Sequence, residues 1–233
     1  MQDKNTKYIS IIWHELRTPL TSIRGYLSMI LEWDMWEISY EARKALNHCY
    51  DSSLRLIKLT NDILMLSKIE SWKMEYYPSK FKILDFIKSV QNDVFVEAEE
   101  QKVELEIEIE KSLKNKSIYY DKDRLKQVFI NLISNAIKFT PENKKVIVKA
   151  SQREKNILFE IIDNWIWIPE DQLQKVFEKF AQVSCDLQKS NKCWLWIWLT
   201  ITKNILKDIW SEIKVTSQVW KWSNFFFELK LLD

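Results

Sequence analysis

Apolar and small residues recur at three- and four-residue spacing along the first third of the chain. The first run starts at Ile9 and continues at positions 12, 16, 20, 23, 27 and 30; the second occupies positions 46, 49, 53, 56, 60, 63 and 67. This spacing places the side chains on one side of an α-helix. Residues 1–72 are therefore predicted to form two long antiparallel helices. Because two helices alone bury little, we expect a second copy to complete a four-helix bundle, which would make the protein a homodimer.

The helical periodicity stops near residue 72, and residues 73–80 are predicted to be a linker because they contain Tyr77, Pro78 and Ser79. Residues 81–233 are predicted to form a second domain. Helices are expected over 84–100, 121–138 and 197–207, with a shorter one near 170–177, and strands over 103–109, 118–120, 145–151, 157–163, 212–217 and 225–231. This order predicts an α+β fold, in which one layer of helices covers a mixed, mostly antiparallel sheet.

Composition and charge exclude several classes of protein. The chain is 46% hydrophobic and 29% charged, and no window approaches the ~18 apolar residues of a membrane span. A net charge of +2 spread over both signs leaves no basic stripe for nucleic acid. The three cysteines are odd in number and share no metal-ligand spacing with either histidine, so they are interpreted as reduced thiols. We expect a cytoplasmic protein whose membrane attachment, if any, would come from an upstream segment.

Glycine and tryptophan occur in unusual numbers. The chain contains one glycine and twelve tryptophans, whereas globular proteins contain about 7% glycine. Tryptophans stand where turns are expected, at positions 33, 36, 165, 167, 220 and 222. Tight turns need a residue that tolerates a positive φ, and tryptophan does so poorly. Our hypothesis is that one codon is translated as glycine in the source but has been translated as tryptophan in this sequence. The alternative is a genuinely tryptophan-rich chain.

Residues 14–20 combine a histidine, an acid, a base and a hydroxyl within the first predicted helix, in the order HELRTPL. This stretch resembles the phosphoacceptor box of sensor histidine kinases, and residues 81–233 resemble their Bergerat-type ATP-binding domain. Residues 131–141, NLISNAIKFTP, resemble the asparagine box of that family, and residues 177–180, FEKF, its phenylalanine box. Residues 163–169, DNWIWIP, and 194–199, WLWIWL, resemble its two glycine boxes, with tryptophan where the family has glycine.

The resemblance implies a role for each residue of the phosphoacceptor box. His14 would attack the γ-phosphate of ATP, because a neutral imidazole is nucleophilic near pH 7. Glu15 would hydrogen-bond the second ring nitrogen and take its proton. Thr18 lies four residues after His14, on the same side of the helix, and would orient the water that hydrolyses a phosphorylated partner. His48 has no such neighbours and is interpreted as a surface residue.

For the nucleotide, the resemblance implies a site that binds ATP and Mg²⁺. Asn135 would be the metal ligand, Asn131 and Lys138 would assist with the phosphates, and Asp163 would accept from the exocyclic amine of adenine. The remaining implied site residues are Phe180 of the phenylalanine box and the tryptophans of the glycine boxes: Trp165, Trp167, Trp194, Trp196 and Trp198. Residues 181–192 are polar and are interpreted either as a mobile lid or as an ordinary surface loop.

The resemblance thus predicts an ATP-dependent protein-histidine autokinase of a two-component phosphorelay. It would be homodimeric, would pass the phosphoryl group from His14 to an aspartate of a response regulator, and would have a phosphatase activity toward that partner. One alternative is a catalytically dead dimeric scaffold, if the tryptophans of the glycine boxes are genuine. Another is an unrelated Bergerat ATPase such as a chaperone, which is disfavoured because those proteins lack the His14 helical hairpin.

Overall fold

The computed structural model describes residues 2–32, 38–71, 74–164, 173, 175–178, 195–218 and 222–232, and the side chains of most of them. The chain divides into two compact units, Met1–Met74 and Glu75–Asp233. Among the described helices, none has both the length and the apolar character needed to cross a membrane.

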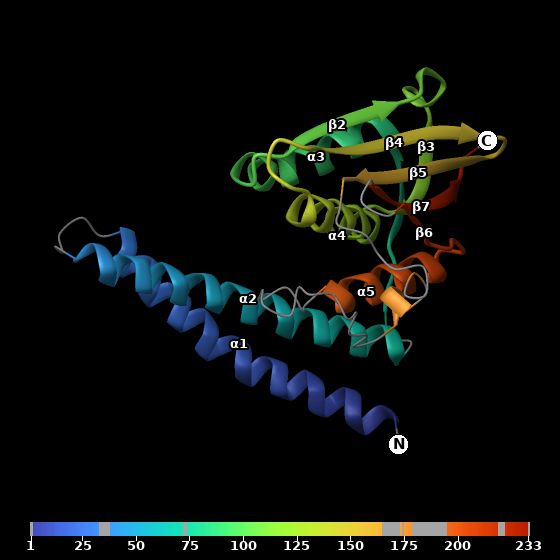
Figure 1. The fold of residues 1–233 in the computed structure, drawn as a ribbon. Helices are drawn as coiled ribbons and strands as arrows, with labels where there is room; N and C mark the ends of the chain where they lie inside the picture. The colour runs from blue at the N-terminus through green and yellow to red at the C-terminus, as the bar shows by residue number, and fades with distance from the viewer. Residues whose placement is uncertain are drawn as a thin grey trace. The chain divides into compact units, whose positions relative to one another are not determined.

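The N-terminal unit is a hairpin of two helices of equal length, α1 (Gln2–Glu32) and α2 (Tyr40–Glu70), as the sequence predicts (Figure 1). Helix α1 continues through Pro19. Helix α2 begins after Ser39, whose hydroxyl accepts a hydrogen bond from the Ala42 amide at 3.2 Å, and such a cap satisfies an amide that the first turn leaves unpaired. At the closed end of the hairpin, Arg43 Nη1 donates to the carbonyl of Leu31 at 3.0 Å.

The C-terminal unit contains a sheet covered by helices on one side, in agreement with the predicted α+β fold (Figure 1). Its five-stranded sheet has the order β2-β4-β5-β7-β6. The strands are β2 (Glu104–Ile109), β4 (Lys145–Arg153), β5 (Asn156–Asp163), β6 (Lys214–Gln218) and β7 (Trp222–Lys230). Strand β2 pairs with β4 in parallel and the other pairs are antiparallel, so the sheet is mixed.

A second, two-stranded sheet pairs β1 (Pro78–Lys82) with β3 (Ser117–Asp121). The sequence analysis did not predict β1, and residues 78–80 of the predicted linker belong to it. The strand escapes prediction because it is short and mostly exposed, and because it pairs with a strand some forty residues later in the chain. A further difference is Trp222, which was expected in a turn and instead begins β7.

The core lies between the five-stranded sheet and three helices: α3 (Ile83–Glu100), α4 (Lys122–Phe139) and α5 (Leu195–Asp208). The fully buried ring of Phe129 on α4 forms edge-to-face contacts with Phe86 on α3, Phe159 on β5 and Phe227 on β7, with ring centroids 5.0 to 5.5 Å apart. Edge-to-face packing of this kind adds to the stabilisation from burial. Short 3₁₀ turns at Lys111–Leu113 and Lys175–Phe177 complete the described elements. A short helix was predicted near 170–177, and residues 170–172 and 174 of that range lie outside the described residues.

Candidate functional site

The predicted phosphoacceptor stretch lies in the middle of α1. His14 and Glu15 are part of this helix, and their side chains lie outside the described ones. Thr18 is exposed one turn later, and its carbonyl accepts a hydrogen bond from Ser22 Oγ at 3.2 Å. The spacing of four residues places His14 and Thr18 on the same side of α1. The helix therefore supplies the arrangement that the sequence analysis required.

Helix α4 positions the two asparagines of the predicted nucleotide site on one side. Asp121 caps this helix by accepting from the amides of Asp123 and Arg124, at 3.1 and 2.9 Å. Asn131 is 7% exposed, and its Nδ2 donates to Thr202 Oγ1 on α5 at 3.4 Å. Asn131 thus has a structural contact between helices that the sequence did not indicate.

Asn135 lies one turn closer to the end of α4 and differs from Asn131 in its hydrogen bonding. Its Nδ2 atom is buried and has no hydrogen-bond partner among the described residues. A buried amide donor without a hydrogen-bond partner destabilises a fold. Few such donors occur in native proteins unless a ligand or a water molecule accepts the hydrogen bond. Lys138, three residues further on, is exposed, and its ammonium lies 5.7 Å from the ring centroid of Phe139.

Helices α4 and α5 run antiparallel, as three contacts show. The Tyr76 hydroxyl donates to Asp208, the last residue of α5, at 2.7 Å. The backbone amide of the next residue, Tyr77, donates to Oδ2 of Asp121, the cap of α4, at 2.7 Å. The end of α5 therefore lies near the start of α4. Because Asn131 contacts Thr202 in between, the end of α4 with Asn135 lies at the level of the start of α5.

Asp163 lies at the same end of the domain. It ends β5, is 1% exposed, and is opposite Val146 of β4 and Ser223 of β7. Only residues 140–144 separate the end of α4 from β4, so the end of β5 and the end of α4 are neighbours. Thr140, the residue that caps α4, is also buried there, and its Oγ1 has no hydrogen-bond partner among the described residues.

The structure thus brings three predicted site residues to one end of the domain, Asn135, Asp163 and Trp198, and places Asn131 one helical turn further from this end. Trp198 is half-buried in the first turn of α5, one helical turn before Thr202. Trp196 is also in α5, but its side chain is outside the described ones, and Trp165, Trp167, Phe180 and Trp194 lie outside the described residues. In the predicted phenylalanine box, the carbonyl of Phe177 accepts from Thr200 Oγ1 on α5 at 3.3 Å.

Two residues of this region were missed by the sequence analysis, Thr140 and Thr202. Thr202 is completely buried and holds Asn131, and it lies four residues after Trp198, a spacing that could have indicated a shared side of the helix. Among the described residues, no cluster of three or more His, Cys, Asp or Glu could hold a metal ion. A metal at this site would therefore rely on amide and phosphate oxygens, which are ligands that Mg²⁺ accepts.

Two family models match the chain. Residues 4–72 match the His Kinase A (phospho-acceptor) domain, and residues 120–233 match the histidine kinase-, DNA gyrase B- and HSP90-like ATPase. The first model spans the helical hairpin, and the second begins at β3 and spans α4, Asp163 and α5. The predicted resemblance to the histidine kinases is confirmed by both matches.

Curated relatives agree with the family models. The aerobic respiration control sensor protein ArcB of Escherichia coli is 32% identical over 225 residues, which cover 96% of this chain and 28% of ArcB. The circadian input-output histidine kinase CikA of Synechococcus elongatus is 28% identical, over 94% of this chain and 29% of CikA. The sensor histidine kinase WalK of Bacillus subtilis is 29% identical, over 91% of this chain and 35% of WalK. The chain therefore spans about a third or less of the length of these relatives.

Solved structures show the same fold. The structure of full-length ShkA in complex with AMPPNP has a TM-score of 0.78 at 23% identity, over 97% of this chain and 46% of that one. The histidine kinase AdeS of Acinetobacter baumannii has a TM-score of 0.63 at 22% identity, over 94% of this chain and 98% of that one. The two family models, which agree with the curated relatives, show that the chain belongs to the sensor histidine kinases of two-component systems.

Proposed function

We propose that this chain is the catalytic core of an ATP-dependent protein-histidine autokinase. The observation that carries the proposal is the buried Asn135 amide, whose donor has no hydrogen-bond partner among the described residues, at the end of the domain where Asp163 is also buried. The Nδ2 donor of Asn135 is suited to bind a polar ligand that supplies its partner, and Asp163 places a buried carboxylate at the same end.

The residues at this end fit a magnesium nucleotide. Asp163 would accept from the exocyclic amine of adenine, and Asn135 would contribute its side-chain oxygen to Mg²⁺, which binds oxygen and keeps several waters. Lys138 would supply a point charge to the phosphates. The start of α5, a helix of 14 residues, would add the partial positive charge of its free amides.

The proposed reaction transfers the γ-phosphoryl group of ATP to His14. A bond forms between a ring nitrogen of His14 and the phosphorus, the bond between the phosphorus and the β,γ-bridging oxygen breaks, and ADP leaves. Glu15 takes the proton of the second ring nitrogen, which keeps the attacking nitrogen nucleophilic. The phosphoryl group would then pass to an aspartate of a response regulator. Thr18, exposed on the same side of α1, would position the water that hydrolyses the aspartyl phosphate of the regulator and releases inorganic phosphate.

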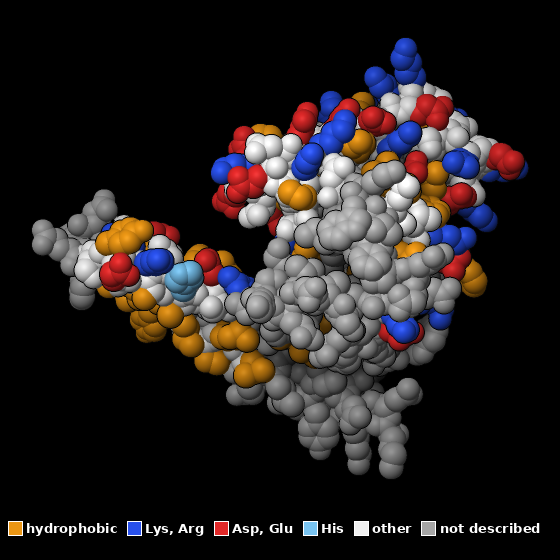
Figure 2. All heavy atoms as spheres, viewed as in Figure 1, with side chains coloured by type: hydrophobic (Ala, Val, Ile, Leu, Met, Phe, Trp, Pro, Cys, Tyr) orange, Lys and Arg blue, Asp and Glu red, His pale blue; other side chains and the backbone are white. Residues whose placement is uncertain are grey.

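The proposed homodimer follows from exposed apolar side chains on the hairpin. Leu16, Ile23 and Ile30 are spaced seven residues apart on α1 and are 37 to 50% exposed, and Leu56 and Ile63 have the same spacing on α2. Figure 2 shows hydrophobic side chains along this hairpin. A heptad of exposed apolar residues is the pattern that packs against a second helical pair. We infer that a second copy of the chain covers these apolar side chains. We also infer that this core acts in the cytoplasm.

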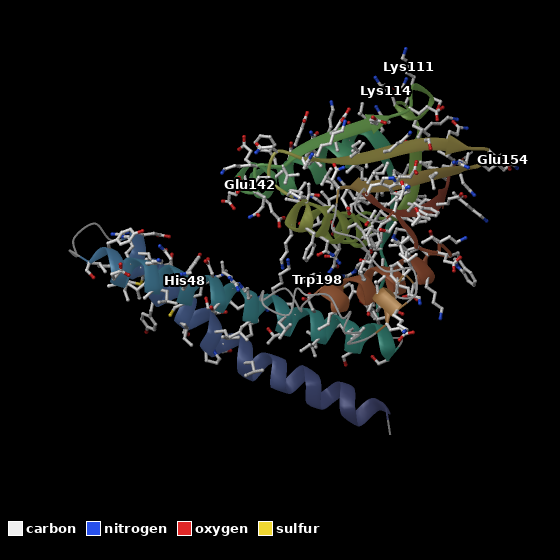
Figure 3. The ribbon with its side chains drawn as sticks, viewed as in Figure 1. His48, Lys111, Lys114, Glu142, Glu154 and Trp198 are labelled. Atoms are coloured by element: carbon white, nitrogen blue, oxygen red, sulfur yellow. The ribbon has the colours of Figure 1, made fainter. Side chains whose placement is uncertain are left out.

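The test uses ATP labelled on its γ-phosphate. The version that carries glycine at the twelve tryptophan positions is expected to acquire acid-labile, alkali-stable label and to lose it completely in His14→Ala, whereas the chain as written is expected to acquire little or none. His48→Ala is the matched control, because His48 is the other histidine of the chain and is exposed on α2, as Figure 3 shows. Label that persists in His14→Ala, or that disappears in His48→Ala alone, would exclude His14 as the acceptor.

A second candidate function is a dimeric scaffold without kinase activity. The observation that favours it is Trp198, because its indole lies in the first turn of α5, where the phosphates would approach. To separate the two functions, the chain as written is compared with a version that carries glycine at the twelve tryptophan positions. The kinase proposal expects label on the glycine version. If neither version is labelled while both remain folded dimers, the scaffold is the better description.

A further inference from the structure

Trp210 has a backbone conformation that tryptophan rarely adopts. It lies two residues after Asp208, the last residue of α5; its φ is 62°, and its side chain is 97% exposed. The Trp210 amide donates to the Lys207 carbonyl at 3.1 Å, and the Ser211 amide donates to the Leu206 carbonyl at 2.8 Å. This pair of bonds is the Schellman ending of a helix, in which the residue at the position of Trp210 is left-handed and is usually glycine.

Nothing in the described part of the chain compensates for this conformation. A side chain that is 97% exposed gains little from burial, so the strain of the left-handed backbone is not offset by packing. Among the described residues, three others have a positive φ: Lys102, Asn143 and Glu154, each at the turn between two elements. Asparagine tolerates this region best among non-glycine residues. Trp210 is therefore the described residue whose type fits its backbone conformation least.

The single glycine of the chain shows the opposite mismatch. Gly25 lies inside α1, its φ is not positive, and a Cβ atom added there would meet no atom within 4 Å. Glycine in a helix interior costs about 1 kcal/mol relative to alanine, and here nothing in the surroundings requires it. The chain thus has tryptophan at a position that calls for glycine, and glycine at a position where any helix-forming residue fits.

We infer that the functional protein carries glycine at position 210, and that its twelve tryptophans as a set occupy glycine positions. For position 210 the inference stands apart from the kinase proposal, because it rests on backbone geometry. For Trp198 in the candidate nucleotide site it rests on the proposed function, since glycine there would remove the indole from the start of α5. The composition of one glycine and twelve tryptophans is the second, independent observation behind the extension to the set.

The first test is the mass of a peptide from the protein isolated from its source. Trypsin cleaves after Lys207 and Lys214, so residues 208–214 form one peptide in which position 210 is the only tryptophan. We expect the mass of the glycine form. The mass of the tryptophan form would overturn the inference, and neither result depends on whether the protein is a kinase. The coding DNA provides an equivalent test. We expect the same codon, one that is a stop codon in the standard code, at all twelve tryptophan positions.

The second test measures the strain directly on the recombinant chain. Trp210→Gly is expected to raise the midpoint of thermal unfolding by a few degrees, and Trp210→Ala to raise it less, because alanine removes the indole but keeps the Cβ. Glu154→Gly is the matched control, since Glu154 has a φ of 51° on an exposed turn and should show a gain from the backbone alone. A Trp210→Gly chain that is less stable than Trp210→Ala would contradict a glycine position.

If tryptophan is the genuine residue at position 210, its side chain is part of the lining of a surface cavity. Trp210 lines a cavity of about 640 Å³ together with Tyr119, Tyr120 and Phe226, on the far side of the domain from Asn135 and Asp163. With glycine at position 210 this cavity loses one of its aromatic lining residues. Protein with tryptophan confirmed at this position by mass, and less stable after Trp210→Gly, would make the cavity an aromatic-walled site and would end the inference.

Discussion

The Tyr76 hydroxyl donates a 2.7 Å hydrogen bond to Asp208 Oδ2, and this contact joins the segment before β1 to the last residue of α5. The next residue, Tyr77, donates its backbone amide to Asp121 Oδ2, the cap of α4, also at 2.7 Å. Residues 76 and 77 are thereby attached to the ends of both helices whose opposite ends form the candidate nucleotide site. Of the predicted linker, 73–80, these contacts hold residues 76 and 77, and residues 78–80 belong to β1.

Removal of the Tyr76 hydroxyl tests the energetic value of this attachment. Tyr76→Phe is expected to lower the free energy of unfolding of the C-terminal unit by about 1 kcal/mol, because it leaves the Asp208 carboxylate without this donor. Chemical denaturation followed by circular dichroism measures the change. Tyr77→Phe is the control, since that hydroxyl contacts only the exposed Glu75 and its loss should leave the midpoint unchanged. Equal effects of the two variants would contradict a specific contribution from Tyr76.

The same pair predicts a dependence on pH. Burial, followed by the hydrogen bond to Asp208, raises the pKa of Tyr76 above its ordinary value of 10.0. A tyrosine whose folded-state pKa is raised stabilises the fold fully below pH 10, and this stabilisation is lost as the pH rises further because the unfolded chain ionises first. The difference in stability between the parent chain and Tyr76→Phe should therefore shrink above pH 10. A difference that stays constant from pH 8 to pH 11 would show that Tyr76 titrates normally.

Alanine substitution is predicted to affect different properties at Asn131 and Asn135: the stability of the domain at Asn131, and the affinity for magnesium ATP at Asn135. Asn131→Ala loses the hydrogen bond to Thr202 and should destabilise the domain by about 1–2 kcal/mol. Asn135→Ala removes a buried donor that has no partner among the described residues, so its effect on stability should be less than about 1 kcal/mol. Its affinity for magnesium ATP, measured by calorimetry, should instead fall by about tenfold or more. Loss of stability without loss of affinity in Asn135→Ala would make that residue structural.

The sequence predicts the helices and most strands of this fold because their periodicities are strong and local. It misses β1, whose partner β3 begins about forty residues later, and it does not indicate that β2 and β4 are parallel. The contact between Tyr76 and Asp208 spans 132 residues and leaves no pattern in the sequence. Contacts of this kind depend on how elements pack, which hydrophobic periodicity alone does not determine.

For the candidate site, the sequence identifies residue types and the structure adds their state of hydrogen bonding. Asn131 and Asn135 look equivalent in sequence, four residues apart in one motif, but Asn131 bonds to Thr202 whereas the Asn135 donor has no partner among the described residues. The spacing places Thr202 on the same side of its helix as Trp198, but the sequence does not predict that Thr202 is buried, because its burial depends on the antiparallel packing of α4 and α5. Asn131 thus stabilises the packing of α4 against α5, and the Asn135 donor is the one proposed to bind a ligand.

The proposed homodimer gives a prediction that separates the hairpin from the ATP-binding unit. Ile23 on α1 and Phe95 on α3 are both 50% exposed, so they are equally accessible in one chain. Ile23→Asp places a charge in the heptad of exposed apolar residues and should convert the dimer into a monomer, because a charge cannot be buried there without a partner. Phe95→Asp should leave the dimer intact. Light scattering coupled to gel filtration measures both masses, and a dimer that survives Ile23→Asp but dissociates in Phe95→Asp would place the interface on the ATP-binding unit instead.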